Sequence, residues 1–269
     1  MTRTFAVVLR VAALVAAAWS PSTAYAQSPP FHPPVARDLA AELACAPNAA
    51  ETAPVQALRV TGGQVAGRNL FGRGETVHVG AGTAQGIETG QDYFVRRVVS
   101  DPFNAHYPDG TTHYQIHTAG WIHIAEVHAG DAVATVTHAC DEVMAGDYLE
   151  PFALPTVPEP AAPGQADLTG AGRLVFGDEW TELGGAGSYM VLNRGSLHGL
   201  HPGQRITIFR SAADAGPPGM MYNRQSSTPG GLIRVGEATA MLVRPGTTTL
   251  RVDRSDGVIY VGDVGAIDR

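Results

Sequence analysis

Histidine is the residue type in this chain with the clearest potential for chemistry, because it is a common ligand of transition metals. Six of the ten histidines fall in one stretch: His106, His113, His117, His123, His128 and His138. Three aspartates lie in or beside that stretch: Asp101, Asp109 and Asp131. The spacing matches no zinc motif such as H-E-x-x-H and offers no closed ligand set. We therefore expect surface histidines and no metal. The alternative is a metal-binding or metal-dependent protein that uses this stretch.

Motifs for other catalytic chemistry are equally weak. No G-x-S-x-G nucleophile elbow is present, and the sequence before Ser188 resembles one only superficially. The glycines on either side of Ala81 lack the lysine of a phosphate-binding loop. Glu126 and Glu237 each lack the second carboxylate that glycoside hydrolysis needs. The sequence therefore predicts no enzyme, no catalytic residue and no cofactor.

The first 26 residues have the pattern of a secretory signal peptide. Arg3 provides the positive start, residues 11–19 form an apolar run, and Thr23-Ala24-Tyr25-Ala26 offers a small-x-small cleavage pattern. The apolar run is too short to span a bilayer, which takes about 20 helical residues, and no later stretch is apolar enough. We expect a periplasmic or extracellular protein with no membrane span after cleavage.

Cys45 and Cys140 are the two cysteines of the chain. In an oxidising compartment an isolated pair usually forms a disulfide, and two separate buried thiols are the alternative. A bonded sulfur is not a nucleophile, which argues against thiol chemistry by Cys140 with the nearby His138. The sequence therefore predicts a Cys45–Cys140 disulfide.

The charge balance excludes two classes of partner. The chain has 18 basic residues, all arginine, against 25 acidic residues, a net charge of −7. Removal of residues 1–26 takes away two arginines (18 − 2 = 16) and brings the net charge to −9 (16 − 25). Nucleic acids and anionic lipid surfaces both require a basic face, so we expect neither as a partner.

One pattern occurs twice along the chain. Residues 86–97 (GIETGQDYFVRR) match residues 199–210 (GLHPGQRITIFR) at an offset of 113 (199 − 86). Residues 120–126 match 231–237 at an offset of 111 (231 − 120), and residues 143–147 match 259–263 at an offset of 116 (263 − 147). Three matched blocks in the same order indicate a tandem duplication of a small domain.

Each repeat has the pattern of an all-β domain. Short runs of alternating, β-branched or aromatic residues are separated by clusters of Gly, Pro, Asn and Asp. Helical spacing occurs near the start, at Val35, Leu39 and Leu43. We predict two tandem, small, antiparallel, partly closed β-barrels with a short N-terminal helix. The expected ranges are 1–26 (signal peptide), 27–54 (extended segment and helix), 55–152 (first β module), 153–169 (Pro/Ala-rich linker) and 170–269 (second β module).

Matched residues at turns have predicted structural roles. Positive φ, which costs glycine little, is expected at four positions: Gly86, Gly90, Gly199 and Gly203. Asp147 and Asp263 each follow a glycine before the last strand of a repeat, where a carboxylate accepts local backbone N–H groups.

The order of these motifs resembles a known module. An alternating strand is followed by G-x-x-x-G-[Q/D], then by G-x-I-x-[V/I]-x-E and an apolar-Gly-Asp ending. This order resembles a β-barrel module that follows LysM domains in many proteobacterial envelope proteins, and it is similar to the C-terminal module of flagellar assembly protein T. The resemblance implies an exported envelope protein that scaffolds or binds and is not a catalyst. The expected partner is an envelope protein or a glycan. No LysM domain, which would normally bind peptidoglycan directly, is recognisable in the sequence.

Two insertions between the matched blocks are the places where we expect binding, because loops on rigid scaffolds often recognise partners. Residues 101–118 and 211–228 provide aromatic and methionine side chains, which are common anchors. The predicted binding residues are Phe103, Tyr107, Tyr114, Trp121, Met220, Met221 and Tyr222.

Overall fold

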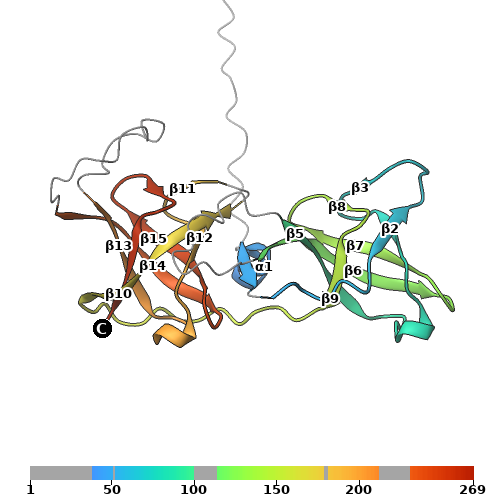
Figure 1. Ribbon diagram of the computed structural model, residues 1–269. Helices are drawn as coiled ribbons and strands as arrows, with labels where there is room; N and C mark the ends of the chain where they lie inside the picture. Colours follow the sequence, from blue (N-terminus) through green and yellow to red (C-terminus); the bar gives the residue numbers. More distant parts are fainter. Residues whose placement is uncertain (1–37, 51, 100–113, 179–180, 212–230) are drawn as a thin grey trace, which may run out of the picture. The chain divides into compact units, whose positions relative to one another are not determined.

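The computed structural model describes residues 38–50, 52–99, 114–178, 181–211 and 231–269 (Figure 1). In these ranges the chain is mostly β-strand, with one short α-helix, so the predicted all-β class is confirmed. No helix in the described ranges has the length and apolar character needed to cross a membrane.

The helix α1 (Leu39–Cys45) is followed by the short strand β1 (Asn48–Ala50). The carboxylate of Asp38 caps the helix by accepting hydrogen bonds from the backbone N–H groups of Ala40 and Ala41. A helix of seven residues is marginal by itself. Its stability therefore depends on packing, and Leu43 and Ala44 are buried.

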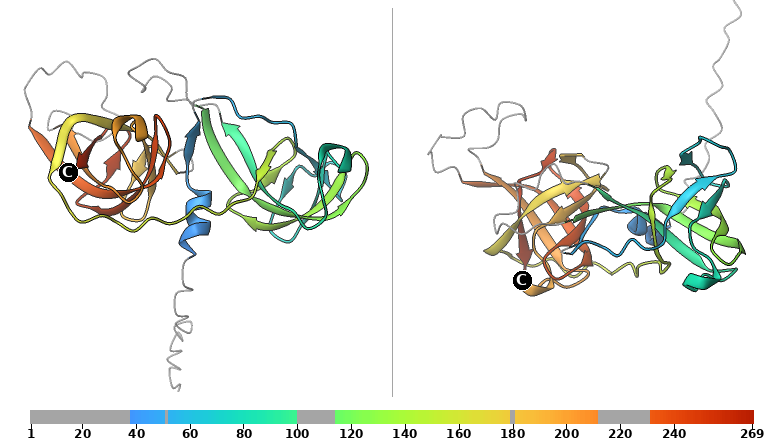
Figure 2. Two further views of the ribbon diagram at one scale, coloured as in Figure 1. Left: turned by 90° about the horizontal axis from the view of Figure 1, so that it is seen from below. Right: turned by 45° about the vertical axis from the view of Figure 1, so that its right-hand side comes forward.

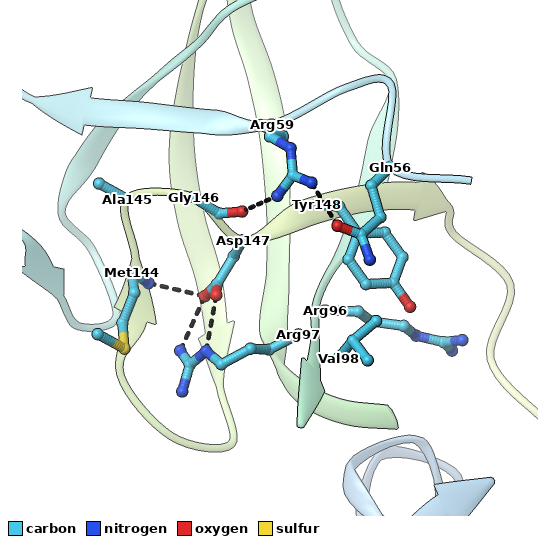
Figure 3. A pocket seen from close by; sticks show the side chains of 10 residues that line it. All are labelled: Gln56, Arg59, Arg96, Arg97, Val98, Met144, Ala145, Gly146, Asp147 and Tyr148. Atoms are coloured by element: carbon cyan, nitrogen blue, oxygen red, sulfur yellow. Dashed lines mark hydrogen bonds and ion pairs between the residues drawn. The ribbon is translucent and has the colours of Figure 1, made fainter. Parts of the chain in front are cut away.

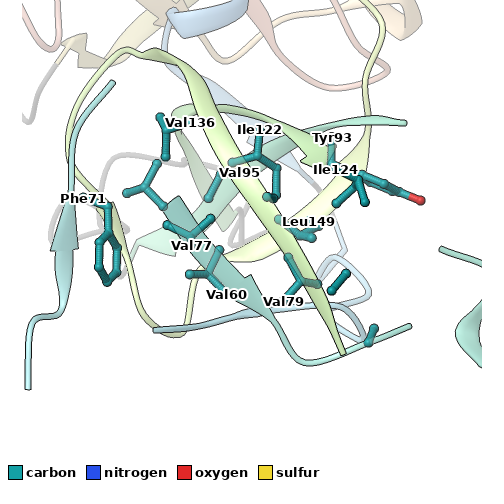
Figure 4. Packing of buried hydrophobic residues seen from close by; sticks show 14 of the residues in the cluster. Val60, Phe71, Val77, Val79, Tyr93, Val95, Ile122, Ile124, Val136 and Leu149 are labelled. Atoms are coloured by element: carbon teal, nitrogen blue, oxygen red, sulfur yellow. The ribbon is translucent and has the colours of Figure 1, made fainter. Parts of the chain in front are cut away.

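The first sheet is antiparallel and has the strand order β2-β4-β7-β6-β5-β9, with β1 paired to β6. Its strands are β2 (Val60–Gly63), β4 (Thr76–Val79), β5 (Asp92–Val99), β6 (Tyr114–Val127), β7 (Ala132–Ala139) and β9 (Tyr148–Pro151). A two-stranded sheet pairs β3 (Leu70–Phe71) with β8 (Val143–Met144). The inner face packs a cluster of buried aliphatic residues that includes Val95 and Ile122 (Figure 4).

Backbone hydrogen bonds also join the two ends of this strand path. The N–H of Val60 donates to the carbonyl of Asp147 at 2.9 Å, and the N–H of Gly146 donates to the carbonyl of Val60 at 2.8 Å. The N–H of Leu149 donates to the carbonyl of Leu58 at 2.9 Å. The residues at the start of β2 are therefore hydrogen-bonded to those at the start of β9.

The second sheet is a closed antiparallel barrel, which appears as a ring in the left view of Figure 2. Its strand order is β10-β12-β15-β14-β13-β17. The strands are β10 (Ala166–Gly177), β12 (Tyr189–Leu192), β13 (Arg205–Ser211), β14 (Leu232–Val243), β15 (Thr248–Ser255) and β17 (Val264–Asp268). A second two-stranded sheet pairs β11 (Leu183–Gly184) with β16 (Ile259–Tyr260). The predicted β-barrel is thus confirmed for this sheet.

The two sheets have the same strand order and the same local hydrogen bonds. The N–H of Gly90 donates to the carbonyl of Ile124, and the N–H of Gly203 donates to that of Ala240. Gly90 and Gly203 are thus equivalent at an offset of 113 (203 − 90), and Ile124 and Ala240 at an offset of 116 (240 − 124). The offset changes across residues 101–118 and 211–228, which lie between the equivalent pairs. A Cβ on Gly120 would lie 2.2 Å from the carbonyl oxygen of His138, and one on Gly236 would lie 2.7 Å from that of Arg254, again at an offset of 116 (236 − 120).

The middle sequence match, between residues 120–126 and 231–237, is therefore wrong in register. Strand β6 aligns with β14 at an offset of 116, whereas that match used 111. The matching glycine and glutamate letters do not occupy equivalent places, so Glu126 and Glu237 are not counterparts.

Equivalent turns precede β5 and β13. The short 3₁₀ helices η1 (Thr83–Gln85) and η4 (Ser196–His198) end at Gly86 and Gly199, whose φ values are 80° and 84°. Gly90 and Gly203 also have positive φ, 91° and 84°. The residues after the first glycines, Ile87 and Leu200, are fully buried. Each turn therefore inserts one aliphatic side chain into the core.

The segment from α1 to β1 contacts strands of both sheets. Leu43 and Ala46 pack with Tyr189 and Met241, and Ala49 packs against the second sheet in a cluster with Val175, Phe176 and Val191. The hydroxyl of Thr249 donates to the carbonyl of Pro47 at 2.7 Å. The same segment is joined to the first sheet through β1 and through the Cys45–Cys140 disulfide, which confirms that prediction.

Candidate functional site

The structure describes two of the seven predicted binding residues. Tyr114 begins β6, opposite Ala50, and is half-buried. Trp121 lies further along β6 and is also half-buried. The remaining five, Phe103, Tyr107, Met220, Met221 and Tyr222, lie outside the described residues.

Trp121 belongs to a row of four rings that crosses the first sheet. Its indole stacks on the imidazole of His138, with ring centroids 3.9 Å apart and planes 3° from parallel. It meets Phe94 edge-on at 5.9 Å and Phe152 at 5.5 Å. Phe94 and Phe152 are 4.8 Å apart. We call these four residues, His138, Trp121, Phe94 and Phe152, the aromatic row.

Strand alternation places the aromatic row on the outer face of the sheet. Side chains alternate between faces along a strand, and the neighbours Val95 and Ile122 point into the core. Phe94 lies opposite Trp121 across β5 and β6, and Trp121 lies opposite His138 across β6 and β7. Phe94 is 3 % exposed, whereas the other three are half-buried. The row therefore presents ring surface at the protein exterior.

Arginine and histidine give this face its electrostatic character. The guanidinium of Arg96 lies 4.7 Å from the centre of the Phe94 ring and is ion-paired with Glu150 at 2.6 Å. Burial lowers the pKa of His138 below its ordinary value, the positive charge of Arg73 lowers it further, and Asp38 opposes the change. The imidazole on Trp121 is therefore held toward its neutral form.

The second sheet has polar residues at the positions that correspond to the aromatic row. Thr207 lies opposite Glu237, and Glu237 lies opposite Arg254, in the pairings that Phe94, Trp121 and His138 have in the first sheet. Phe152 corresponds to Asp268 (268 − 152 = 116), whose carboxylate accepts a hydrogen bond from the Thr207 hydroxyl at 2.7 Å. The ring contacts are therefore specific to the first sheet.

An arginine-lined pocket of about 270 Å³ lies near the start of β9 (Figure 3). Arg59 donates to the carbonyl of Gly146 and to the side chain of Gln56. Tyr148 also lines the pocket; its hydroxyl has no hydrogen-bond partner, and burial raises its pKa. Because that hydroxyl oxygen is shielded from solvent, a ligand in the pocket would not reach it.

One wall of this pocket is a bidentate ion pair that recurs in the second sheet. Arg97 donates to both carboxylate oxygens of Asp147, at 2.7 and 2.9 Å, and Arg210 does the same to Asp263, at 2.9 and 2.6 Å. Both aspartates are buried, and each also accepts a backbone N–H within its turn at 2.8 Å. The sequence matched these residues separately, and the pairing emerges only in the fold. Its repetition points to a structural role.

The described histidines of the first sheet do not converge on a metal site. Three of them each meet a single carboxylate: His117 with Asp141, His123 with Asp92 and His128 with Glu126. His106 and His113 lie outside the described residues. Within the described ranges, one group of three metal-binding side chains occurs: Cys45, Cys140 and His138, with the two sulfurs in a disulfide.

No known family model matches the chain, and no curated protein matches its sequence. The function has to be argued from the aromatic row and its surroundings.

Proposed function

We propose that this protein is a non-catalytic, exported protein of the bacterial cell envelope that binds or scaffolds an envelope protein or glycan. The aromatic row is its contact surface. The observation that supports this proposal is the set of four contacting rings on the outer face of one sheet, where the equivalent positions of the other sheet are polar.

The chemistry of the row suits recognition. Tryptophan, tyrosine and arginine are the residues most enriched at binding hot spots. Aromatic side chains suit this role because they bury much surface with few rotatable bonds. The T-shaped and stacked contacts fix the rings before a partner arrives, which lowers the entropy cost of binding. A barrel needs no outward rings for its own closure, as the polar equivalents in the second sheet illustrate.

We further propose that residues 55–152 and 170–269 are two copies of one β-barrel module. The common strand order, the two Arg–Asp pairs and the equivalent turns support this view. Together with the motif order, they favour kinship with the module found after LysM domains and in flagellar assembly protein T. The disulfide supports export, since such bonds persist mainly in oxidising compartments.

The test compares Trp121→Ala with Glu237→Ala, the same strand position in the other sheet. Each purified protein is immobilised and exposed to solubilised envelope proteins, and each is also sedimented with purified peptidoglycan. We expect the Glu237 variant to keep the partner of the wild type, and the Trp121 variant to bind at least about tenfold more weakly, as loss of a hot-spot ring does. Equal binding by both variants, or no ligand in either assay, would contradict the proposal.

A further inference from the structure

We propose that Cys45, Cys140 and His138 form a binding site for a thiophilic d¹⁰ metal ion, of which Zn²⁺ is the test case, once a dithiol reductant opens the disulfide. The three potential ligand atoms all lie within 4.8 Å of one another. Two thiolates and one imidazole are a ligand set that zinc accepts, with its fourth position left to water. This site is independent of the binding function proposed above.

The protein holds the two cysteines together without their covalent bond. Cys140 follows β7, and its backbone N–H donates to the carbonyl of Ala119 in β6 at 2.9 Å. Cys45 ends α1, and the neighbouring Leu43 and Ala46 are buried against the second sheet. The pairing of β1 with β6 holds the following residues. Reduction removes none of these contacts, so the two thiols should remain neighbours.

His138 is already directed at the pair of sulfurs. Its Nε2 lies 3.9 Å from Sγ of Cys45, and its ring is held flat against Trp121. A metal-bound histidine needs a fixed ring orientation, which is normally set by a second contact. Here the indole provides that contact.

The geometry needs only a local adjustment. Zn–S bonds are about 2.3 Å, so two sulfurs at a tetrahedral zinc lie about 4 Å apart. The Cα atoms of Cys45 and Cys140 are 5.6 Å apart, a separation that lets the side chains rotate to admit the ion. All three side chains are half-buried, so the site is neither sealed nor fully solvated.

The chemistry balances with the dithiol as the reductant. Its two thiols become a disulfide, and the Cys45–Cys140 bond takes up the two electrons and two protons to give two thiols. Zinc then replaces the thiol protons, and two protons pass to solvent. In the oxidised protein both sulfurs are engaged in the disulfide, so the site exists only after reduction.

The experiment titrates Zn²⁺ alone into the untagged full chain, with and without prior reduction. A phosphine replaces the dithiol as reductant, because a dithiol would itself bind zinc; the phosphine and one water become the phosphine oxide, and the disulfide becomes the same two thiols. A chromophoric chelator reports the affinity, and alkylation of the thiols reports whether the metal covers them. We expect one tightly bound Zn²⁺ per reduced chain, none per oxidised chain, and thiols that zinc protects from alkylation.

His138→Gln and His123→Gln are the matched variants. Both keep the disulfide during folding, and His123 lies in β6 with Asp92 as its partner, away from the sulfurs. We expect reduced His138→Gln to bind Zn²⁺ at least about tenfold more weakly, the least that loss of a ligand should cost, and His123→Gln to match the wild type. No stoichiometric binding by the reduced protein, or equal affinity in the two variants, would overturn the proposal.

Discussion

The first and second sheets share their framework and differ in their outer faces. Both have the same strand order, a glycine where two strands approach closely, and a buried aspartate held by a bidentate arginine. Where the first sheet has Phe94 opposite Trp121, the second has Thr207 opposite Glu237. The comparison shows that the strand order, the close-approach glycine and the Arg–Asp pair recur, whereas the outer-face residues at these positions do not.

Loss of the disulfide should lower stability more than any other change, and the first sheet should be destabilised more than the second. The bond closes a loop with a sequence separation of 95, for which the loop-entropy model gives at most about 4.7 kcal/mol of stabilisation. We expect reduction to lower hydrogen-exchange protection in β6 and β7 more than in β14 and β15. Equal losses in the two sheets would contradict a local role of the bond.

Removal of Arg97 or of Arg210 should lower the free energy of unfolding by a similar amount. Arg97→Ala or Arg210→Ala leaves a buried aspartate without its charge partner, which costs about 3–5 kcal/mol for a fully buried pair. Arg97 is 28 % exposed and Arg210 is 14 % exposed, so solvent screening should reduce this to about 2–4 kcal/mol. Urea unfolding measures the effect.

The matched control for these arginines is Arg68→Ala. Its partner Glu75 and its own side chain are both substantially exposed, 33 % and 50 %, so the loss should stay below about 1 kcal/mol. A loss for Arg97 or Arg210 as small as this would show that the recurring pair does not stabilise the two sheets.

Truncation of Trp121 should lower the free energy of unfolding by a smaller amount, and truncation of Glu237 should hardly change it. Trp121→Ala removes three ring contacts, each worth about 0.5–1.5 kcal/mol in a favourable geometry. Because the side chain is half-exposed, we expect a total of about 2 kcal/mol. Glu237→Ala removes a surface pair with Arg234, worth less than about 0.5 kcal/mol. Equal costs in thermal unfolding would contradict the contrast between the two faces.

The pH dependence of His138 should be the smallest effect. Its folded pKa lies below the ordinary value of 6.5, mainly because of burial. The unfolded chain therefore takes up this proton first as the pH falls. The contribution of His138 to the stability of the folded state is fully present above pH 6.5. It decreases as the pH falls through 6.5, and it stops changing below the folded pKa of His138. His138→Gln should remove this part of the acid sensitivity, as measured by unfolding between pH 7 and 5.

A spectroscopic readout tests the same group without unfolding. An imidazolium stacked on an indole should quench its fluorescence more than a neutral imidazole does. In a background that carries both Trp19→Phe and Trp180→Phe, so that Trp121 is the remaining tryptophan, we expect its emission to fall with a midpoint below pH 6.5. A midpoint at or above that value would contradict the effect of burial.

The sequence predicted what is determined locally. Alternation and turn residues indicated an all-β chain, and two cysteines in a chain that we expected to be exported indicated the disulfide. The positive φ of Gly86 and Gly199 follows from turn chemistry that operates within a few residues. The alignment of β6 with β14 was not accessible in this way, because the segment between residues 97 and 120 is shorter than the one between residues 210 and 236. A short match of letters does not reveal that difference in length.

The candidate site was predicted only in part for the same reason. Trp121 was chosen as an aromatic anchor, but Phe94 and His138 come from two other strands, and Phe152 directly follows a third, β9. The available signal was the alternation of side chains along each strand: Phe94 lies next to Val95, and Trp121 next to Ile122, and these neighbours belong to the core. Alternation predicts which face of the sheet a side chain occupies. It does not predict which side chain of the next strand lies beside it, because that depends on strand order and register.

The earliest described segment of the chain depends on partners that are made much later. The carbonyl of Pro47 accepts a hydrogen bond from Thr249, which lies 202 residues later in the sequence. The disulfide partner of Cys45 is Cys140, which lies 95 residues later. If the chain emerges from a translocation channel with its amino end first, α1 and β1 are the first of the described elements to appear and among the last to be secured. Oxidation of the thiols becomes possible once Cys140 has emerged, whereas packing of the same segment against the second sheet requires the much later Thr249. Folding on export would therefore secure this segment in two stages.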